Sequence, residues 1–154
     1  MDLTDILDQD AVVASLKVQS KKRLFQEIAA TAHSRLKLEE AMVHSALLER
    51  ETLGPTGVGY GVAIPHARID GLDRVRGLFF HLETAIEFES VDRRPVDLAF
   101  VLLAPLDAGA DHLKALARVS RVLRSEPVCN KLRSTGDVSA LYAILTDTDT
   151  SQAA

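Results

Sequence analysis

The segment with the clearest chemical potential is residues 54–68, where a glycine-rich stretch precedes a short apolar run, a proline and a histidine. Its glycines are Gly54, Gly57, Gly59 and Gly61. Glycine permits positive φ and close approach of the backbone to a ligand. Pro65 has no N–H, so we expect the strand before it to end there. This arrangement places His66 at a strand end and makes it the candidate reactive group.

A second histidine occupies a comparable position. His112 follows Asp111 in the first turn of a helix expected over residues 109–125, directly after the most apolar strand. A helix N-terminus has unpaired N–H groups and a partial positive charge, which suit an anion and favour a neutral histidine. If the two strand ends lie side by side, His66 and His112 face one pocket. The remaining histidines fit ordinary half-exposed or hydrogen-bonded positions; they are His33, His44 and His81.

Short motifs narrow the chemistry further. The sequence contains no G-x-x-x-x-G-K-[ST] loop and no G-x-S-x-G elbow, and its glycines do not match G-x-G-x-x-G. His66, His112 and a nearby Asp could form a metal site, but no dense ligand cluster supports one. We therefore expect neither a metal nor a cofactor. Two roles stay open for His66, general base and phosphoryl acceptor, and a general base would need a second nucleophile that is not evident.

The elements that must position these residues alternate between helical and extended patterns. Helices are expected over about 21–36, with Ser20 as N-cap, and over 39–51, 109–125, 127–133 and after Asp137. Strands are expected over 12–18, 61–64, 77–83, 86–88 and 96–104, the last of them buried on both faces. The sequence therefore predicts a single-domain α/β sandwich, with a mixed β-sheet of about five strands flanked by helices. The domain spans 1–146, and 147–154 is expected to be a disordered tail.

Composition excludes several functional classes. The chain has 154 residues, a net charge of −4 and no long Lys/Arg run, which argues against a nucleic-acid partner. The acidic N-terminus lacks the pattern of a signal peptide, and no apolar run is long enough to cross a bilayer. The lone Cys129 rules out an internal disulfide and fits a reducing compartment. We expect a cytoplasmic protein that does not insert into membranes.

Two longer motifs connect the candidate residues. One runs Arg50-Glu51-x-x-Gly54-x-Thr56-Gly57-Val58-Gly59-x-Gly61-Val62-Ala63-Ile64-Pro65-His66, and the other is Asp111-His112-Leu113. Together they resemble the active-site regions of the fructose/mannitol-type enzyme IIA domain of the bacterial phosphoenolpyruvate phosphotransferase system. The resemblance covers roughly residues 1–146, and a free-standing chain looks most like the nitrogen-regulatory branch. Pro55 and Ala67 depart from the usual serine and glycine, which could alter loop stiffness and partner fit without removing a reactive group.

The resemblance implies a phosphotransferase with a phosphohistidine intermediate. His66 would accept a phosphoryl group from an HPr-like (NPr-type) phosphocarrier protein, with His112 and Arg50 as the other catalytic residues. We expect backbone N–H groups around Gly57–Gly61 to bind phosphoryl oxygens and a backbone carbonyl to orient the His66 ring. The loop residues assigned to phosphoryl binding or orientation are Thr56, Gly57, Gly59 and Gly61. Arg68 is expected to be a solvated surface residue.

The partner that follows the carrier is left open by the sequence. Val58, Val62 and Ile64 are expected to provide apolar surface for docking of the carrier protein. The chain could have a regulatory, nitrogen-related role, or it could pass the phosphoryl group to a separate enzyme IIB or membrane permease. Alternatively, it is a regulatory binding module whose target proteins respond to the charge that phosphorylation adds to His66.

Overall fold

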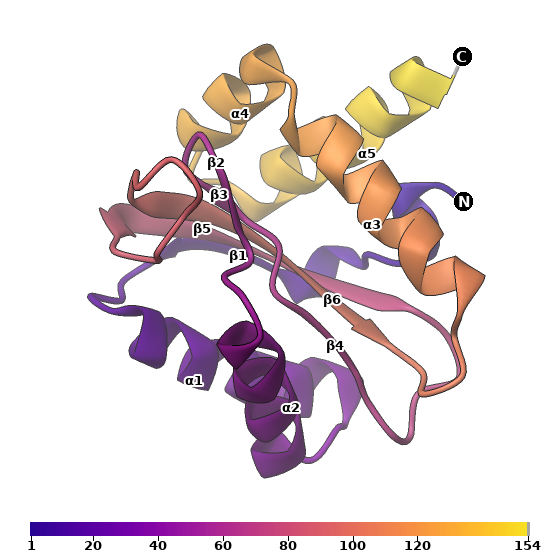
Figure 1. Cartoon of the computed structure of the whole chain (residues 1–154). Helices are drawn as coiled ribbons and strands as arrows, with labels where there is room; N and C mark the ends of the chain where they lie inside the picture. The colour runs from indigo at the N-terminus through magenta and orange to yellow at the C-terminus, as the bar shows by residue number, and fades with distance from the viewer. Residues whose placement is uncertain (154) are drawn as a thin grey trace.

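Six strands form one mixed sheet in the order β1-β5-β6-β3-β2, and β4 also pairs with β6 (Figure 1). The strands are β1 (Val12–Leu16), β2 (Gly57–Gly59), β3 (Val62–Ala63), β4 (His66–Arg68), β5 (Arg76–Ile86) and β6 (Val96–Ala104). Strand β6 is antiparallel to β5 and parallel to β3 and β4. The predicted α/β sandwich with a mixed sheet of about five strands is confirmed.

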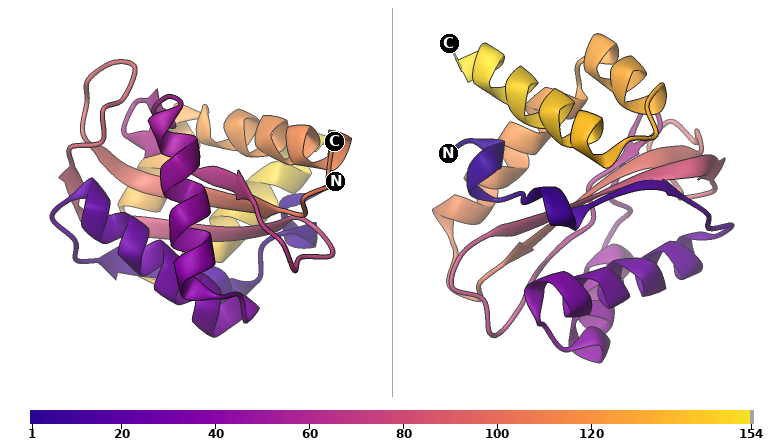
Figure 2. Two further views of the ribbon diagram at one scale, coloured as in Figure 1. Left: turned by 60° about the horizontal axis from the view of Figure 1, so that its bottom comes forward. Right: turned by 180° about the vertical axis from the view of Figure 1, so that it is seen from behind.

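Helices cover both faces of this sheet, as Figure 2 shows from two further directions. The first pair lies on one face, and the three later helices lie on the other (Figures 1 and 2). They are α1 (Lys21–Leu36), α2 (Glu40–Thr52), α3 (Ala110–Leu123), α4 (Glu126–Arg133) and α5 (Val138–Ala153), preceded by the short 3-10 helices η1 (Leu3–Asp5) and η2 (Gln9–Ala11). Because β6 lies between the two helical layers, Leu98 through Leu103 are fully buried, as its unbroken apolar sequence predicts.

Local signals in the sequence locate the helix ends. The Ser20 hydroxyl accepts a hydrogen bond from the Arg23 backbone N–H at 3.1 Å, which caps α1 as expected. The Asp137 carboxylate accepts one from the Ala140 N–H at 2.9 Å, ahead of α5.

The computed structural model describes the backbone of residues 1–153 and the side chains of residues 1–147. Residues 148–154 of the expected disordered tail lie outside the fully described part, so that expectation stays untested. None of the described helices has the length and apolar character needed to cross a membrane.

The strand before Pro65 ends as expected, at Ala63, but a second strand that the sequence did not predict begins directly after Pro65, at His66. Val62 and Ala63 pair with Leu98 and Ala99, and His66 and Ala67 pair with Leu102 and Leu103, all in one constant register. Proline lacks only its own N–H, and the Pro65 carbonyl still accepts a hydrogen bond from Leu102 at 3.0 Å. Strand β4 therefore continues the line of β3 along β6, and His66 is its first residue.

The glycine-rich segment is also more ordered than the expected loop. Gly57–Gly59 forms β2, which folds back antiparallel onto β3 as a hairpin. Its turn uses positive φ at three successive residues, Gly59, Tyr60 and Gly61, which explains the need for glycine on either side of Tyr60.

Candidate active site

The structure brings His66 and His112 into contact. His66 is the first residue of β4, and its ring lies on the face of the sheet that α3 covers. His112 is the third residue of α3 and comes from the chain directly after β6. The two ring centroids are 5.6 Å apart and meet edge to face at 74°. The expected pairing of the two histidines is therefore present in the fold.

The tautomer of His66 follows from one contact. Its Nδ1 lies 2.8 Å from the carbonyl oxygen of Ile64. A carbonyl can only accept, so Nδ1 carries the proton and donates it to Ile64. The other nitrogen, Nε2, then holds the lone pair of the neutral ring. The expected orienting group, a backbone carbonyl, thus belongs to Ile64.

Burial is the main influence on the charge state of His66. Desolvation lowers the pKa of His66 below 6.5, and the hydrogen bond to Ile64 opposes that shift. The nearby guanidinium of Arg50 lowers the pKa of His66 further, and the carboxylate of Glu51 raises it. Since the net shift is downward, His66 is neutral at pH 7 and carries a nucleophilic nitrogen.

Arg50 lies in the last turn of α2, directly before the glycine-rich segment. Its Nη1 donates a hydrogen bond to the Gly54 carbonyl at 2.9 Å. That bond uses one of the five N–H donors of a guanidinium, so the remainder can bind another acceptor. A cation that is held by the loop and whose field reaches His66 is suited to an anion bound at Nε2.

His112 contributes a buried imidazole with unused hydrogen-bonding capacity. The side chain is buried, and its Nε2 has no hydrogen-bond partner among the described residues. Burial lowers the pKa of His112, and the charges of His66 and Arg68 lower it further. Arg68 is exposed, as expected for a surface residue. A neutral ring with a free nitrogen at the N-terminus of a 14-residue helix can donate to a negatively charged group.

Thr56 is bound within the protein instead of facing the histidines. Its hydroxyl donates to one carboxylate oxygen of Glu51 at 2.6 Å, and its backbone N–H donates to the other at 2.9 Å. The second carboxylate oxygen also pairs with Lys21 at 2.8 Å. From the sequence, Glu51 was identified only as part of the Arg50–His66 motif and was assigned no role. No sequence pattern pointed to Lys21 on α1.

The tip of the hairpin lies away from the histidine pair. The Tyr60 N–H donates to Asp92, and the Gly61 carbonyl accepts from Asp97 and Leu98. Gly61 thus meets β6 at Leu98, whereas His66 pairs with Leu102. At about 3.3 Å per residue the two points are about 13 Å apart along the strand. The structure brings Arg50, His66 and His112 together, and it places Gly59 and Gly61 elsewhere. Gly57 pairs with Ala63 within the hairpin.

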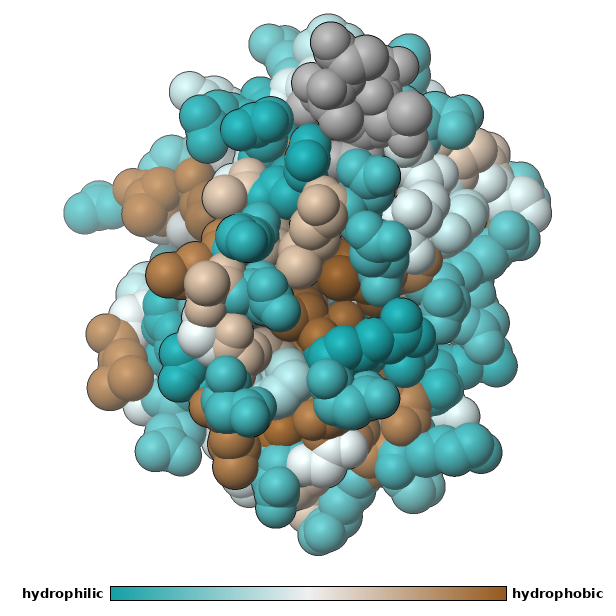
Figure 3. All heavy atoms as spheres, turned by 90° about the vertical axis from the view of Figure 1, so that its right-hand side faces the viewer, coloured by the Kyte–Doolittle hydropathy of each residue, from teal (hydrophilic) through white to brown (hydrophobic). Residues whose placement is uncertain are grey.

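The apolar surface near the site differs from the expected one. Val62 and Ile64 are buried, at 1% and 3% exposure, so the prediction that they form docking surface is wrong. Both belong to the hydrophobic core: Val62 lies in β3 between β2 and β6, and Ile64 follows β3 directly. Val58 is half exposed as expected. Three exposed apolar residues lie close in the chain to elements of the site: Leu53 directly after α2, Leu106 shortly after β6 and Leu113 next to His112. Figure 3 shows hydrophobic residues at the surface among hydrophilic ones, on the side of the molecule where α3 begins.

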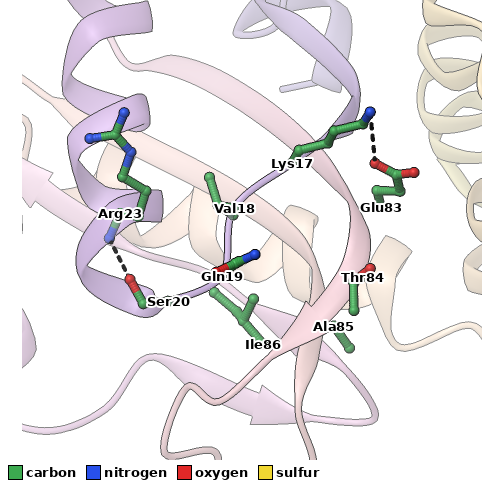
Figure 4. Close-up of a pocket in the computed structure, with 9 residues that line it drawn as sticks. All are labelled: Lys17, Val18, Gln19, Ser20, Arg23, Glu83, Thr84, Ala85 and Ile86. Atoms are coloured by element: carbon green, nitrogen blue, oxygen red, sulfur yellow. Dashed lines mark hydrogen bonds and ion pairs between the residues drawn. The ribbon is translucent and has the colours of Figure 1, made fainter.

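Other parts of the described structure offer less chemistry. A shallow hollow of about 840 Å³ lies between the end of β1 and the far end of β5 (Figure 4). Two of its three charged residues, Lys17 and Glu83, form an exposed ion pair at 3.9 Å, and the third is Arg23. No histidine lines it. Within the described residues, no group of three His, Cys, Asp or Glu side chains could hold a metal ion.

Comparisons with known proteins agree with this geometry. Residues 5–148 match the family described as "Phosphoenolpyruvate-dependent sugar phosphotransferase system, EIIA 2". A nitrogen regulatory protein of Bradyrhizobium diazoefficiens is 50% identical over 145 residues, which cover 94% of this chain and 95% of the relative.

Two solved structures share the fold. The nitrogen regulatory protein IIA-Ntr of Neisseria meningitidis superposes with a TM-score of 0.88 at 35% identity, covering 94% of this chain and 99% of that one. The mannitol enzyme IIA of Escherichia coli, solved in complex with phosphorylated enzyme IIB, has a TM-score of 0.76 at 18% identity over 92% of this chain and 99% of that one. The family match and the 50% identical relative together show that this chain belongs to the EIIA type 2 family of the phosphoenolpyruvate-dependent sugar phosphotransferase system.

Proposed function

We propose that this chain is a phosphoryl carrier that accepts a phosphoryl group on Nε2 of His66 from a phosphohistidine of an HPr-like carrier protein. The observation that carries the proposal is the Nδ1–Ile64 hydrogen bond, which leaves a lone pair on Nε2 of a neutral ring. Nε2 attacks phosphorus while the bond from phosphorus to the donor nitrogen breaks. The donor imidazole keeps the electron pair of that bond, and His66 retains its proton on Nδ1.

The surrounding groups supply the stabilisation that this reaction needs. Phosphoryl transfer spreads negative charge over three oxygens and depends mainly on positioning and electrostatics. The remaining donors of Arg50, and the Nε2 of His112, which has no partner among the residues that the structure describes, are available to bind those oxygens. The N-terminus of α3 adds a partial positive charge on the same side. Gly59 and Gly61 then act by shaping the hairpin, and Thr56 acts by holding the start of the loop.

Protein partners suit the open surroundings of this site. Leu53, Leu106 and Leu113 are 81%, 58% and 70% exposed, and in the chain they follow α2, β6 and His112, respectively. Exposed apolar residues around a reactive group favour a protein substrate over a small molecule enclosed in a cavity. The mannitol enzyme IIA, with its enzyme IIB complex, supports an enzyme IIB as an acceptor of the phosphoryl group from this chain.

A regulatory role is the second part of the proposal. The name of the 50% identical relative, nitrogen regulatory protein, supports it. Phosphorylation would add up to about two negative charges at His66. This added charge can repel or recruit a target protein. Affinity capture with phosphorylated and unphosphorylated protein distinguishes this switch from a sugar-delivery role. Identical sets of bound proteins in the two forms would contradict the switch.

Direct phosphorylation tests the proposed acceptor. The protein is incubated with phosphoenolpyruvate, enzyme I and an HPr-like carrier, and an acid-labile adduct is followed by intact-mass analysis. We expect one phosphoryl group on the wild type and none on His66→Ala. His33→Ala, which changes an exposed helical histidine, is the matched control and should be phosphorylated normally. An adduct that persists in His66→Ala would refute the assignment.

A further inference from the structure

Glu51 connects three separate parts of the chain near the proposed phosphoryl acceptor. It lies in the last turn of α2, one residue after Arg50, and its side chain is only 7% exposed. Its carboxylate receives two hydrogen bonds from Thr56, one from the backbone and one from the hydroxyl. The same carboxylate pairs with Lys21 at 2.8 Å. A buried carboxylate with three donors is strongly fixed, because each bond satisfies a charge that water cannot reach.

Lys21 is itself held in place from another element. Its Nζ lies 3.3 Å from the Phe88 carbonyl and 4.5 Å from the centroid of the Phe88 ring. Lys21 begins α1, so the cluster joins α1, the end of α2 and the segment after β5. These contacts hold the lysine close to Glu51 at low exposure, which keeps the carboxylate paired.

The cluster reaches His66 through the backbone. The carbonyl of Thr56 accepts a hydrogen bond from the Ile64 N–H at 3.0 Å. The carbonyl of Ile64 accepts the one from His66 Nδ1 at 2.8 Å. A continuous series of hydrogen bonds therefore runs from Lys21 through Glu51, Thr56 and Ile64 to the ring. Displacing Thr56 would displace the peptide whose carbonyl sets the orientation and tautomer of His66.

From these contacts we infer that Glu51, paired with Lys21, is a positioning residue that holds the Thr56–Ile64 backbone so that His66 presents Nε2 to the phosphoryl donor. The inference rests on the proposed function for its effect on transfer. The orientation of the ring, in contrast, can be measured in the protein alone. Glu51 also balances the charge of Arg50, because the two residues shift the pKa of His66 in opposite directions. The other titratable ring that faces His66 is His112.

The test compares Glu51→Ala with Glu51→Gln, and uses Glu49→Ala as control. Glu49 is an exposed carboxylate on the same helix, whose side chain takes no part in the cluster. Nitrogen-15 NMR of the imidazole reports the tautomer of His66, and rapid-quench kinetics with the phosphorylated carrier reports transfer. For Glu51→Ala we expect loss of the pure Nδ1–H tautomer and transfer slower by about 10- to 100-fold.

The variant Glu51→Gln separates the effect of the hydrogen bonds to Thr56 from the effect of the negative charge. Glu51→Gln keeps hydrogen-bonding atoms for Thr56, so the tautomer and most of the transfer rate should recover. The pKa of His66 should nevertheless fall, because the negative charge is gone. A merely structural role would predict reduced thermal stability without a change in tautomer. If Glu51→Ala does not fold, Lys21→Met tests the same series from its other end, with the same expected direction.

The outcomes decide the inference independently of the proposed function. A wild-type tautomer and transfer rate in Glu51→Ala, or in Lys21→Met, would overturn the role of Glu51. A wild-type protein that takes no phosphoryl group would overturn the proposed function, and the NMR comparison would still decide whether Glu51 positions the ring. Equal effects of Glu49→Ala and Glu51→Ala would show a general effect of charge on α2 and would also overturn it.

Discussion

Replacing His112 by leucine should slow phosphoryl transfer and leave the fold at least as stable as the wild type. The His112 side chain is 7% exposed, and its Nε2 is buried without a hydrogen-bond partner among the described residues. Leucine is close in size to the imidazole and has no polar atom. The substitution therefore removes an unsatisfied buried group and, at the same time, one donor for the phosphoryl oxygens.

The two effects have different magnitudes and opposite signs. A buried polar group without a partner costs about 1–3 kcal/mol, and each kcal/mol corresponds to about 2–4 °C in the melting temperature of a domain of this size. We expect the melting temperature to stay level or to rise by a few degrees. A hydrogen bond to a charged group contributes about 1.5–3 kcal/mol, and loss of that stabilisation in the transition state slows transfer by roughly 10- to 150-fold.

Two measurements on the same preparations separate these effects. Single-turnover transfer from the phosphorylated carrier gives the rate, and calorimetry gives the melting temperature. His112→Asn retains a side-chain donor and should lose less of the rate than His112→Leu. A variant with the wild-type rate and a lower melting temperature would refute the reasoning, because His112 would then be a satisfied core residue.

Three further predictions concern the rest of the site and its hairpin. Because burial lowers the pKa of His66, the unfolded chain binds more protons than the folded protein just below pH 6.5. Calorimetry should therefore show the stability of the fold falling as pH drops through about 6.5. A pH–rate profile should show the transfer rate staying on its plateau to lower pH. Arg50→Gln should raise the pKa of His66 and slow transfer. Arg50→Lys should keep the pKa but still slow transfer about 10-fold or more, because lysine lacks the planar, two-pronged guanidinium group. NMR titration and transfer kinetics distinguish the two variants. Gly61→Ala should lose about 2–3 kcal/mol in denaturant unfolding, since φ is +79° and the new Cβ would lie 2.5 Å from Arg133 Nη2; Gly54→Ala, with open space around it, should be nearly neutral.

Several features of the fold could be predicted from short stretches of sequence. The Ser20 cap, the capping carboxylate of Asp137 and the unbroken apolar run of β6 each depend on residues close together in the chain. For the same reason the motif from Arg50 to His66 could be recognised as the candidate reactive segment: its residues run from the end of α2 through the β2–β3 hairpin to the start of β4. Features of this kind depend on neighbouring residues in the chain and can therefore be predicted without knowing the tertiary structure.

Other features depended on contacts that no local pattern contains. A new strand, β4, begins directly after Pro65, where the Pro65 carbonyl accepts a hydrogen bond from the Leu102 N–H on β6. Val62 and Ile64 are buried in the core that the assembled sheet and helices form, so an apolar sequence alone could not distinguish core from docking surface. The role of Lys21 could not be predicted from the sequence, because its partner Glu51 lies on a different helix.

By itself the sequence determined that His66 follows a glycine-rich segment, that Arg50 precedes it, and that a second histidine begins a later helix. Only the tertiary structure decided that the two rings lie 5.6 Å apart, that Ile64 holds Nδ1, and that the hairpin tip is fastened to Asp92 and β6, away from the histidines. The physical reason is that residue types and spacing specify which groups are available. Burial, tautomer and charge balance instead arise from neighbours that β6 and the two helical layers bring together from distant parts of the chain.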